Sequence, residues 1–308
     1  MSFLVLAVTQ YYYLVRGAYF SIFTFPTALW LFTVNVFHDG SHFAVSKYPF
    51  INNIMTETAL LFSTPFTWYH QHIIGHHCFP NIMGKDPDLY HSVKFIRHSR
   101  DIRHKPPHAN QAFIFPLLWV IGVPLGLILR GCLDSLAGKP YNKVVPLIPD
   151  EAAHIISRKS VLPRLGAIVV TMFVLPVCYH GMTWKGLAFA VFPYLVYSCH
   201  FMVCSQINHF TPESDDQVSK NFYIQQVLTG HNVAPESYLL YLYTGGLNMQ
   251  IEHHLFPSVN HCHLRKLAPY VRALCAKHNI HYNVSPGMFT AVQRYVDHLR
   301  KFAVSSVP

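Results

Sequence analysis

The sequence contains four long apolar runs that we interpret as candidate membrane helices. A membrane-spanning helix needs about 17–25 predominantly apolar residues. Because only the short segment 181–185 separates the last two runs, we expect those two to form a helical hairpin. The segment 1–14 is also apolar but too short to span a membrane, so it fits a truncated first span or the second half of another helix. The four runs are 17–37, 113–129, 165–179 and 187–204.

The distribution of basic residues predicts which side of the membrane each connection occupies. The segment 85–105 holds six Lys and Arg residues, whereas the hairpin connection 181–185 holds one. Positive charge favours the cytoplasmic side, so we expect 85–105 and the basic, mixed-polarity region after about residue 206 to be cytoplasmic. The sequence therefore predicts an all-α integral membrane protein with about four transmembrane helices and a cytoplasmic helical cap.

We expect one membrane domain over residues 1–308. The run 113–129 contains two Pro and two Gly residues, so we interpret 111–131 as a re-entrant or interfacial helix, covered by protein where its backbone is irregular. This interpretation keeps the polar segments on its two sides on the same face of the membrane. The expected parts are N-terminal span or spans over 1–37, a cytoplasmic segment 38–110, the helix 111–131, a transmembrane hairpin 161–205, and a cytoplasmic C-terminal cap 206–308.

Composition supports a membrane protein whose metal chemistry would rest on imidazole. The chain is 51% hydrophobic and only 12% charged, against about 25% charged in ordinary soluble domains. Its net charge of +9 indicates contact with anionic headgroups or an anionic substrate, and no groove-reading motif suggests nucleic acid. The 22 His residues outnumber the 14 Asp and Glu residues. The seven Cys residues form no C-x-x-C pair, which disfavours a thiolate zinc site.

The histidines gather in tight groups near the ends of the apolar runs. Residues three or four apart share one face of a helix, so each group would project its side chains together if its segment is helical. A fourth feature is a single histidine, His209, which closes the last apolar run. The groups are His38 with His42, His72 with His76 and His77, and Gln250 with His253 and His254.

These groups predict a metal centre. Any one histidine is more often an ordinary core or surface residue, but three groups and a helix-end histidine on one predicted membrane face are hard to explain in that way. Imidazole suits Zn, Cu, Fe and Ni. Eight imidazoles exceed the needs of one ion, so we expect two, and an apolar protein suits iron that activates O₂. The candidate ligands are His38, His42, His72, His76, His77, His209, His253 and His254.

At this point the chain resembles the membrane fatty acid desaturases, in particular their front-end (cytochrome b5-type) branch, which acts on acyl chains and sphingolipids. The likeness covers roughly residues 37–282. The third box continues as Gln-Ile-Glu-His-His-Leu-Phe-Pro, the pattern of this branch, in which Gln replaces the first His. The boxes are His38-Asp-x-x-His42, His72-x-x-x-His76-His77 and Gln250-x-x-His253-His254, with supporting matches at Trp68, Asn81, Asp86, Asp88, Gln206, Asn208, Asn248 and Pro269.

The resemblance implies a di-iron centre facing the cytoplasm in the endoplasmic reticulum membrane, with the eight histidines as ligands. In this family O₂ is the co-substrate, electrons come from cytochrome b5 and its reductase, and a double bond is introduced into an acyl chain. The substrate would be an acyl-CoA, a phospholipid or a sphingolipid, with front-end regiospecificity. Gln250, His70, Asn208, Asp86 and Asp88 are further candidates, either as ligands or as partners of the ligands. For Asp86 and Asp88, an ordinary solvated turn around Pro87 is an equal alternative.

The chain departs from the family pattern in two places. The second box has three residues between its first two histidines where many relatives have two, so His70 rivals His72, although His72 gives the helical spacing. No His-Pro-Gly-Gly haem motif is present. Either the electron donor is a separate protein, or a fused cytochrome b5 domain lies upstream of Met1.

Two other functions remain open at this point. A membrane di-iron lipid hydroxylase shares the C–H chemistry and differs in how the substrate radical is trapped. A non-enzymatic metal-binding membrane protein, such as a transporter or sensor, would need ionisable residues inside its spans. Of that kind the runs 17–37 and 187–204 contain only His200, which argues against a transport pathway.

Overall fold

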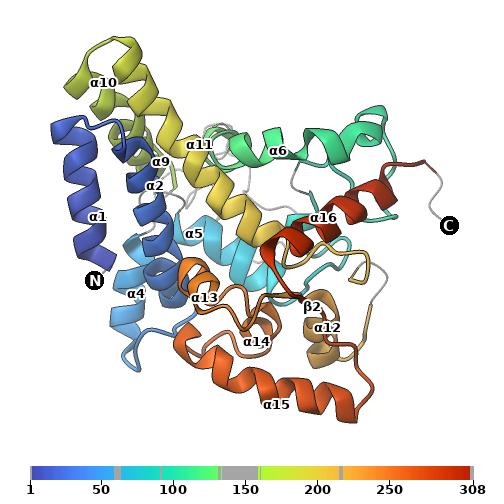
Figure 1. The fold of residues 1–308 in the computed structure, drawn as a ribbon. Coiled ribbons are helices and arrows are strands. Elements are labelled where there is room, and N and C mark those ends of the chain that lie inside the picture. The colour runs from blue at the N-terminus through green and yellow to red at the C-terminus, as the bar shows by residue number, and fades with distance from the viewer. Residues whose placement is uncertain are drawn as a thin grey trace. The chain divides into compact units, whose positions relative to one another are not determined.

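The chain is predominantly helical and forms two compact units (Figure 1). The computed structural model describes residues 2–58, 64–90, 92–130, 161–214 and 218–305, and the single positions 133 and 159. Unit 1 comprises Met1–His70 and Trp119–Met202, and unit 2 comprises Gln71–Leu118 and Val203–Pro308. Within the described residues the regular strands are β1 (Asn232–Val233) and β2 (Val284–Ser285), which pair in parallel. The predicted all-helical class is therefore confirmed.

Unit 1 consists of helices in which α and π winding alternate. A polar pair links η2 to α11, because Thr33 Oγ1 lies 3.0 Å from Tyr197 Oη. The ring of Tyr13 stacks on Phe25 and Phe189 with centroid distances of 4.6 and 5.6 Å. The elements of this unit are α1 (Ser2–Tyr11), η1 (Tyr12–Arg16), α2 (Ser21–Phe32), η2 (Thr33–Phe37), α3 (His38–Ser41), α4 (Pro49–Glu57), α5 (Pro65–Trp68), η7 (Gly122–Leu129), α9 (Leu162–Val169), η9 (Val170–Val174), α10 (Leu175–His180) and most of α11 (Trp184–Gln206).

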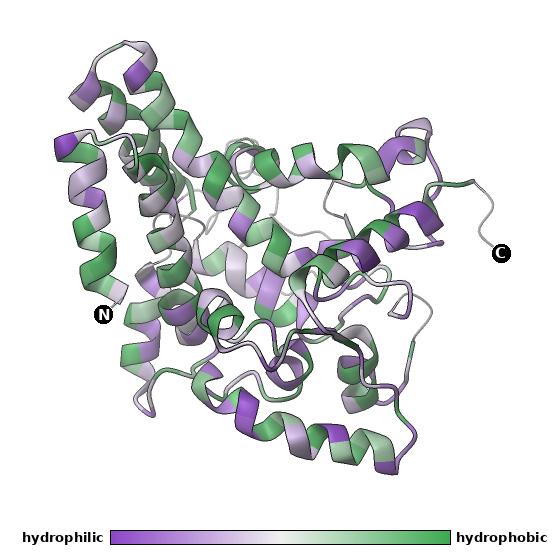
Figure 2. Ribbon diagram, in the orientation of Figure 1, coloured by the Kyte–Doolittle hydropathy of each residue, from purple (hydrophilic) through white to green (hydrophobic). Residues whose placement is uncertain are grey.

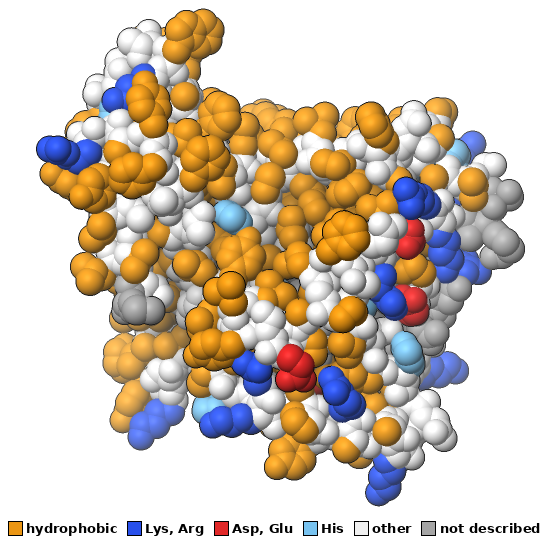
Figure 3. Space-filling view, viewed as in Figure 1, with side chains coloured by type: hydrophobic (Ala, Val, Ile, Leu, Met, Phe, Trp, Pro, Cys, Tyr) orange, Lys and Arg blue, Asp and Glu red, His pale blue; other side chains and the backbone are white. Residues whose placement is uncertain are grey.

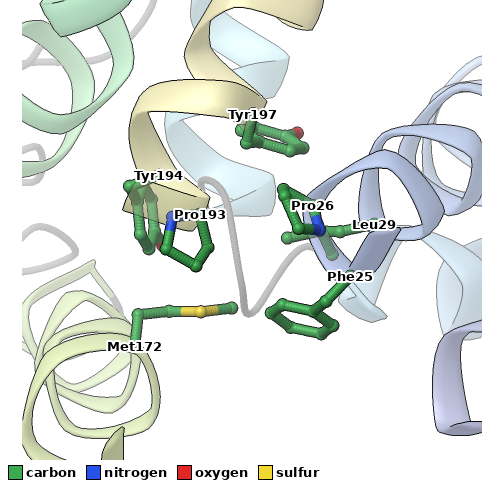
Figure 4. Close-up of a pocket in the computed structure, with 7 residues that line it drawn as sticks. All are labelled: Phe25, Pro26, Leu29, Met172, Pro193, Tyr194 and Tyr197. Carbon is green, nitrogen blue, oxygen red and sulfur yellow. The ribbon is translucent and has the colours of Figure 1, made fainter. Parts of the chain in front are cut away.

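A small apolar pocket lies in this unit between α2, η9 and α11 (Figure 4). Its empty volume is about 170 Å³. No charged side chain lines it. The lining residues are Phe25, Pro26, Leu29, Met172, Pro193, Tyr194 and Tyr197.

Three helices are long and apolar enough to cross a membrane, namely Pro106–Leu129, Leu162–His180 and Trp184–Gln206. Figure 2 shows hydrophobic colouring over much of α11, with polar positions between the apolar ones. Large apolar side chains point outward, and Phe113 and Trp184 are 86% and 88% exposed, as expected for helices surrounded by lipid. The second and third helices are joined by a three-residue connection after His180. Their arrangement as a transmembrane hairpin stays a prediction.

The other two predicted spans need separate comment. The first apolar run forms α2 and η2 over residues 21–37, and the helix continues into α3, but it is not one of the three candidate spans among the described residues. Its threonines and Asn35 lower its hydropathy. The segment expected to be re-entrant is helical from Pro106 to Leu129 and changes from α to π winding at Gly122. Its re-entrant placement stays a prediction, and residue 131 lies outside the described residues.

Unit 2 is built around the short helix α14. Two apolar clusters hold this helix: Ile251 packs with Val227 and Val271, and Met249, which directly precedes the helix, packs with Tyr241 and Leu264. Figure 1 shows α12, α14 and α15 lying close together. The elements of this unit, some of which extend into unit 1, are η4 (Tyr69–His76), η5 (Pro87–Tyr90), η6 (Pro106–Asn110), α6 (Gln111–Ile121), α12 (Phe222–Thr229), β1, α13 (Tyr238–Thr244), α14 (Gln250–Leu255), η10 (His261–His263), α15 (Leu264–Lys277), β2 and α16 (Met288–Phe302).

The helices of unit 2 differ in surface character from the candidate spans. Helices α15 and α16 each bury one face, including Val271 and Leu299, and carry Lys and Arg residues on the other. Figure 3 shows Lys and Arg side chains over these two helices, and hydrophobic side chains over α10 and α11. Amphipathic helices of this kind are typical of a water-facing region.

Candidate metal centre

The first histidine box is a short helix in unit 1. The amide of His42 donates to the carbonyl of His38 at 3.2 Å, which closes one α-helical turn. The two rings are therefore neighbours, with centroids 4.7 Å apart, and both are buried. Trp68 Nε1 donates to Ser41 Oγ at 3.0 Å and anchors the turn. The predicted i,i+4 pairing of this box is confirmed.

The second box lies on a π-helix, η4. The amide of His77 donates to the carbonyl of His72 at 3.0 Å, five residues back. This wider turn brings His72 onto the same side as both His76 and His77, and Nε2 of His72 lies 3.2 Å from Nε2 of His77. Short π-helical stretches often occur at functional sites. The sequence predicted helical spacing but not this winding.

The third box is α14, whose orientation is fixed by β1. The side chain of Asn232 accepts from Ile251 N at 2.9 Å and donates to Glu252 Oε2 at 2.8 Å. Gln250, His253 and His254 are all buried. In unit 2 the ring of His254 stacks on that of His77 with centroids 4.2 Å apart, so the second and third boxes meet face to face.

Three imidazoles of unit 2 converge on one point. Ligand atoms of His76, His209 and His254 all lie within 4.8 Å of one another, and all three residues are buried. Nε2 of His76 and Nε2 of His209 are 3.1 Å apart. His209 follows the last turn of α11, so three segments distant in sequence supply one nitrogen each.

A hydrogen-bond acceptor faces the other ring nitrogen of each of these imidazoles. His76 Nδ1 lies 3.3 Å from Asp86 Oδ2. His209 Nδ1 lies 3.1 Å from the carbonyl oxygen of Thr229, and His254 Nδ1 lies 2.8 Å from Gln226 Oε1. An acceptor at Nδ1 places the ring proton there and leaves Nε2 to bind a metal.

The pKa values of His76 and His209 are shifted in opposite directions. Burial alone would lower the pKa of His76, but the carboxylates of Asp86 and Asp88 raise it to about 9. Burial, helped by the charge on His76, holds the pKa of His209 well below its usual value. Their Nε2 atoms lie 3.1 Å apart, and an ion bound between them would take the place of a proton.

This donor set fits an imidazole-bound transition metal. A metal–nitrogen bond of about 2.1 Å allows two ligand nitrogens to lie up to roughly 4.2 Å apart. The ligand atoms of His76, His209 and His254, which lie within 4.8 Å of one another, would need to move together only slightly. The other histidines of unit 2 lie beside this group. The centroids of His77 and His253 are 4.8 Å apart, and those of His72 and His253 are 6.5 Å apart.

The further candidates have distinct environments. Gln250 Nε2 lies 2.7 Å from His209 Nε2, and Asn208 donates to the Leu247 carbonyl at 2.8 Å and to Gln250 Oε1 at 3.4 Å. Asp88 accepts from Gln71 Nε2 at 3.1 Å. The ring of His70 lies on Phe66, with centroids 4.5 Å apart. His70 belongs to none of the His, Cys, Asp and Glu groups among the described residues that could share an ion, which favours His72 as the first histidine of the second box.

Asp86 is not part of a solvated turn. It is fully buried, accepts from the amides of Asn81 at 2.8 Å and Asp88 at 2.9 Å, and faces His76. Asn81 also donates to the carbonyl of His209 at 3.0 Å. The loop that follows the second box therefore folds back to hold both His76 and His209.

Sequence reasoning missed the partners contributed by α12 and by the β1–β2 region. Gln226 and the carbonyl of Thr229 are the acceptors for two imidazoles, and the one available signal was a pair of glutamines in an otherwise apolar helix. Glu252, which is expected from helical spacing to point away from the His253 and His254 face, is buried and accepts from Tyr282 Oη at 2.7 Å.

Comparison with known proteins finds several lipid desaturases of similar sequence. The acyl-lipid omega-13 desaturase of Chlamydomonas reinhardtii is 29% identical over 290 residues, which cover 86% of this chain and 58% of that protein. The Delta(5) fatty acid desaturase A of Dictyostelium discoideum is 27% identical, covering 88% and 60%. The sn-1 linoleoyl-lipid 6-desaturase of Arthrospira platensis is 25% identical, covering 88% and 74%. The chain thus spans about 60% of the length of the first two relatives.

The family profile covers most of the chain. A profile described as fatty acid desaturase matches residues 14–286, a range that includes all three histidine boxes and His209. The chain therefore belongs to the fatty acid desaturase family.

Proposed function

We propose that this chain is the catalytic region of an O₂-dependent membrane lipid desaturase, which introduces a double bond into a fatty acyl or sphingoid chain at a di-iron centre. The observation that carries the proposal is the convergence of His76, His209 and His254, whose Nδ1 atoms all face hydrogen-bond acceptors. Family membership and the desaturase names of the relatives support the same chemistry.

The proposed ligands are the eight histidines of the boxes and the helix end. His76, His209 and His254 would hold one ion. His72, His77 and His253 of the same unit would contribute to the second. For His38 and His42 the support is their helical pairing and the resemblance of their box to the family pattern.

Iron bound to these imidazoles would supply an oxidant able to remove hydrogen from an unactivated C–H bond, with O₂ and external electrons as co-reactants. The protein's own contribution is to hold the ligands in one tautomer and to exclude water, since seven of the eight histidines are buried. Gln250, whose amide lies 2.7 Å from the ligand nitrogen of His209, would stand beside the ion as a further ligand or as a partner of the ligands. We propose cytochrome b5 and its reductase as the electron source.

We propose about four membrane spans, with the histidine-bearing segments in a cytoplasmic cap and 111–131 as a re-entrant or interfacial helix, in the endoplasmic reticulum. Three candidate spans support membrane insertion. The basic segment 85–105 supports the cytoplasmic side for unit 2.

We propose a front-end position for the double bond, between an existing double bond and the carboxyl end. The Gln250-x-x-His253-His254 box supports this assignment. Two relatives are named as a Delta(5) desaturase and a 6-desaturase. The acyl carrier would be CoA, a phospholipid or a sphingolipid.

Expression in a host without polyunsaturated lipids, supplied with monoenoic and dienoic acids and a cytochrome b5, tests the proposal by lipid profiling. New double bonds support the desaturase, and new alcohols would instead establish the hydroxylase. A metal-loaded protein that gives neither product would favour the non-enzymatic alternative. A His254→Ala variant, which removes one proposed ligand, serves as the inactive control.

A further inference from the structure

Helix α12 supplies hydrogen-bond acceptors to two of the converging imidazoles. Gln226 Oε1 faces His254 Nδ1 at 2.8 Å, and the carbonyl oxygen of Thr229 faces His209 Nδ1 at 3.1 Å. The first contact is made by a side chain, and the second by a backbone carbonyl in the last turn of α12. Helices α12 and α14 pack directly against each other (Figure 1).

The orientation of the Gln226 amide is determined by its second partner. Its Nε2 donates to the carbonyl oxygen of His77 at 3.0 Å. Turning the amide over would place its oxygen against that carbonyl oxygen, so the amide oxygen must face His254. The side chain is completely buried, and water cannot readily replace either hydrogen bond.

From this geometry we infer that Gln226 is a positioning residue, which holds His254 in the Nδ1–H tautomer and ties its ring to the backbone of the second histidine box. The inference rests on the proposed function, because it takes Nε2 of His254 to be a metal ligand. Partners of this kind typically change metal affinity 10–100-fold when they are lost.

The surroundings of α12 hold Gln226 in place. The side chain of Asn221 caps the helix by accepting from the amides of Tyr223 and Ile224. Gln225 donates to the carbonyl of Pro80 at 3.0 Å. At Gly230 an added Cβ would lie 3.0 Å from Ile251 Cγ1 on α14, so the end of α12 closely contacts the helix that bears His254.

Metal titration of the whole chain in detergent, with Co²⁺ as the probe and its visible spectrum as the readout, tests the inference. Gln226→Met removes the acceptor and keeps the side-chain length. Gln226→Glu, which is protonated in this buried site, restores both an acceptor oxygen for His254 and a donor for the His77 carbonyl. Gln111→Met is the matched control, because Gln111 is also a completely buried glutamine and its amide contacts only backbone groups, those of Arg97 and Leu299. Gln226→Asn, with a shorter amide that cannot reach both partners, replaces Gln226→Met if that variant does not fold.

We expect Gln226→Met or Gln226→Asn to weaken Co²⁺ binding at least tenfold and to change its spectrum, while Gln226→Glu recovers most of the affinity and Gln111→Met matches wild type. In a His254→Ala background, Gln226→Met should have no further effect, because the two residues act as a unit. Wild-type affinity and spectrum in Gln226→Met and Gln226→Asn, or additive losses in the double variant, would overturn the inference. Failure of the wild-type chain to bind Co²⁺ would instead count against the proposed metal centre itself.

Discussion

His76 and His209, which are 133 positions apart in the chain, bring their Nε2 atoms to within 3.1 Å of each other. The Nδ1 atom of His76 faces Asp86, and that of His209 faces a backbone carbonyl. The two rings can therefore turn away from this arrangement only by breaking buried hydrogen bonds. Such fixed partners make the ligand set rigid before any ion arrives.

Replacing Asp86 should weaken the metal site without removing a ligand. In Asp86→Asn one carboxylate oxygen becomes an amide NH2 group. This group is a donor and would face another donor, which is the Asn81 amide, the Asp88 amide or the His76 Nδ1 proton. We expect a 10–100-fold loss of metal affinity, measured by titration with Co²⁺. Asp101→Asn, at an exposed position, is the control, and equal affinities in the two variants would show that Asp86 does not orient His76.

Glycine at position 40 allows the first box to pack on α4. An added Cβ there would lie 2.6 Å from Met55 Cβ and 3.1 Å from the backbone oxygen of Asn52. Gly40→Ala should therefore push α3 away from α4, lowering the thermal unfolding temperature and the metal content together. At Gly166 an added Cβ meets no atom within 4 Å, so Gly166→Ala should be neutral or stabilising by up to about 1 kcal/mol. A Gly40→Ala protein that is more stable than the Gly166→Ala protein would contradict this account of how the first box packs on α4.

Much of the site was predictable because its histidines are spaced at the repeat of an α-helix. The pairs in the first and third boxes follow from residues three or four apart, and both segments are helical. The π winding of η4 was not predictable, because it depends on hydrogen bonds that the spacing of His72 and His76 does not specify. The role of Gln226 was also hidden, since a buried glutamine is recognisable only when its partners are known.

The membrane segments illustrate the same limit. Hydropathy and length identified the helices that end at Leu129, His180 and Gln206. The first run lies near the boundary, because polar residues such as Asn35 interrupt it while its helical structure continues into the first box. Whether such a helix spans the membrane depends on the residues that pack around it, and composition does not specify these contacts.

The buried carboxylate of Glu252 should make Tyr282 important for stability. Tyr282 Oη donates to Glu252 Oε1 at 2.7 Å, and burial raises the pKa of this carboxyl. Tyr282→Phe leaves the oxygen without that donor, which should cost about 1–3 kcal/mol in denaturant or thermal unfolding. Tyr270→Phe is the matched control, because Tyr270 is exposed on α15, and a Tyr282→Phe protein as stable as this control would contradict the prediction.

His298 should make the fold sensitive to acid. Burial lowers its pKa to about 4, although its Nδ1 donates to the Thr211 carbonyl at 3.2 Å. The unfolded chain binds a proton near pH 6.5 and the folded chain does not, so stability should fall as the pH drops from about 6.5 to 4, by up to roughly 3 kcal/mol. His298→Asn keeps a donor near Nδ1 and cannot titrate. Unfolding measured against pH should therefore show a shallower acid slope in this variant, and an unchanged slope would exclude His298 as the cause.

Metal content after anaerobic purification with Fe²⁺ tests the central claim most directly. The account predicts two iron ions per wild-type chain, and at most one in His209→Ala. A control variant, His278→Ala at an exposed position beyond α15, should retain both. A wild-type chain that holds no iron, prefers zinc or binds a single ion would contradict the di-iron proposal, as would a His209→Ala chain that keeps two.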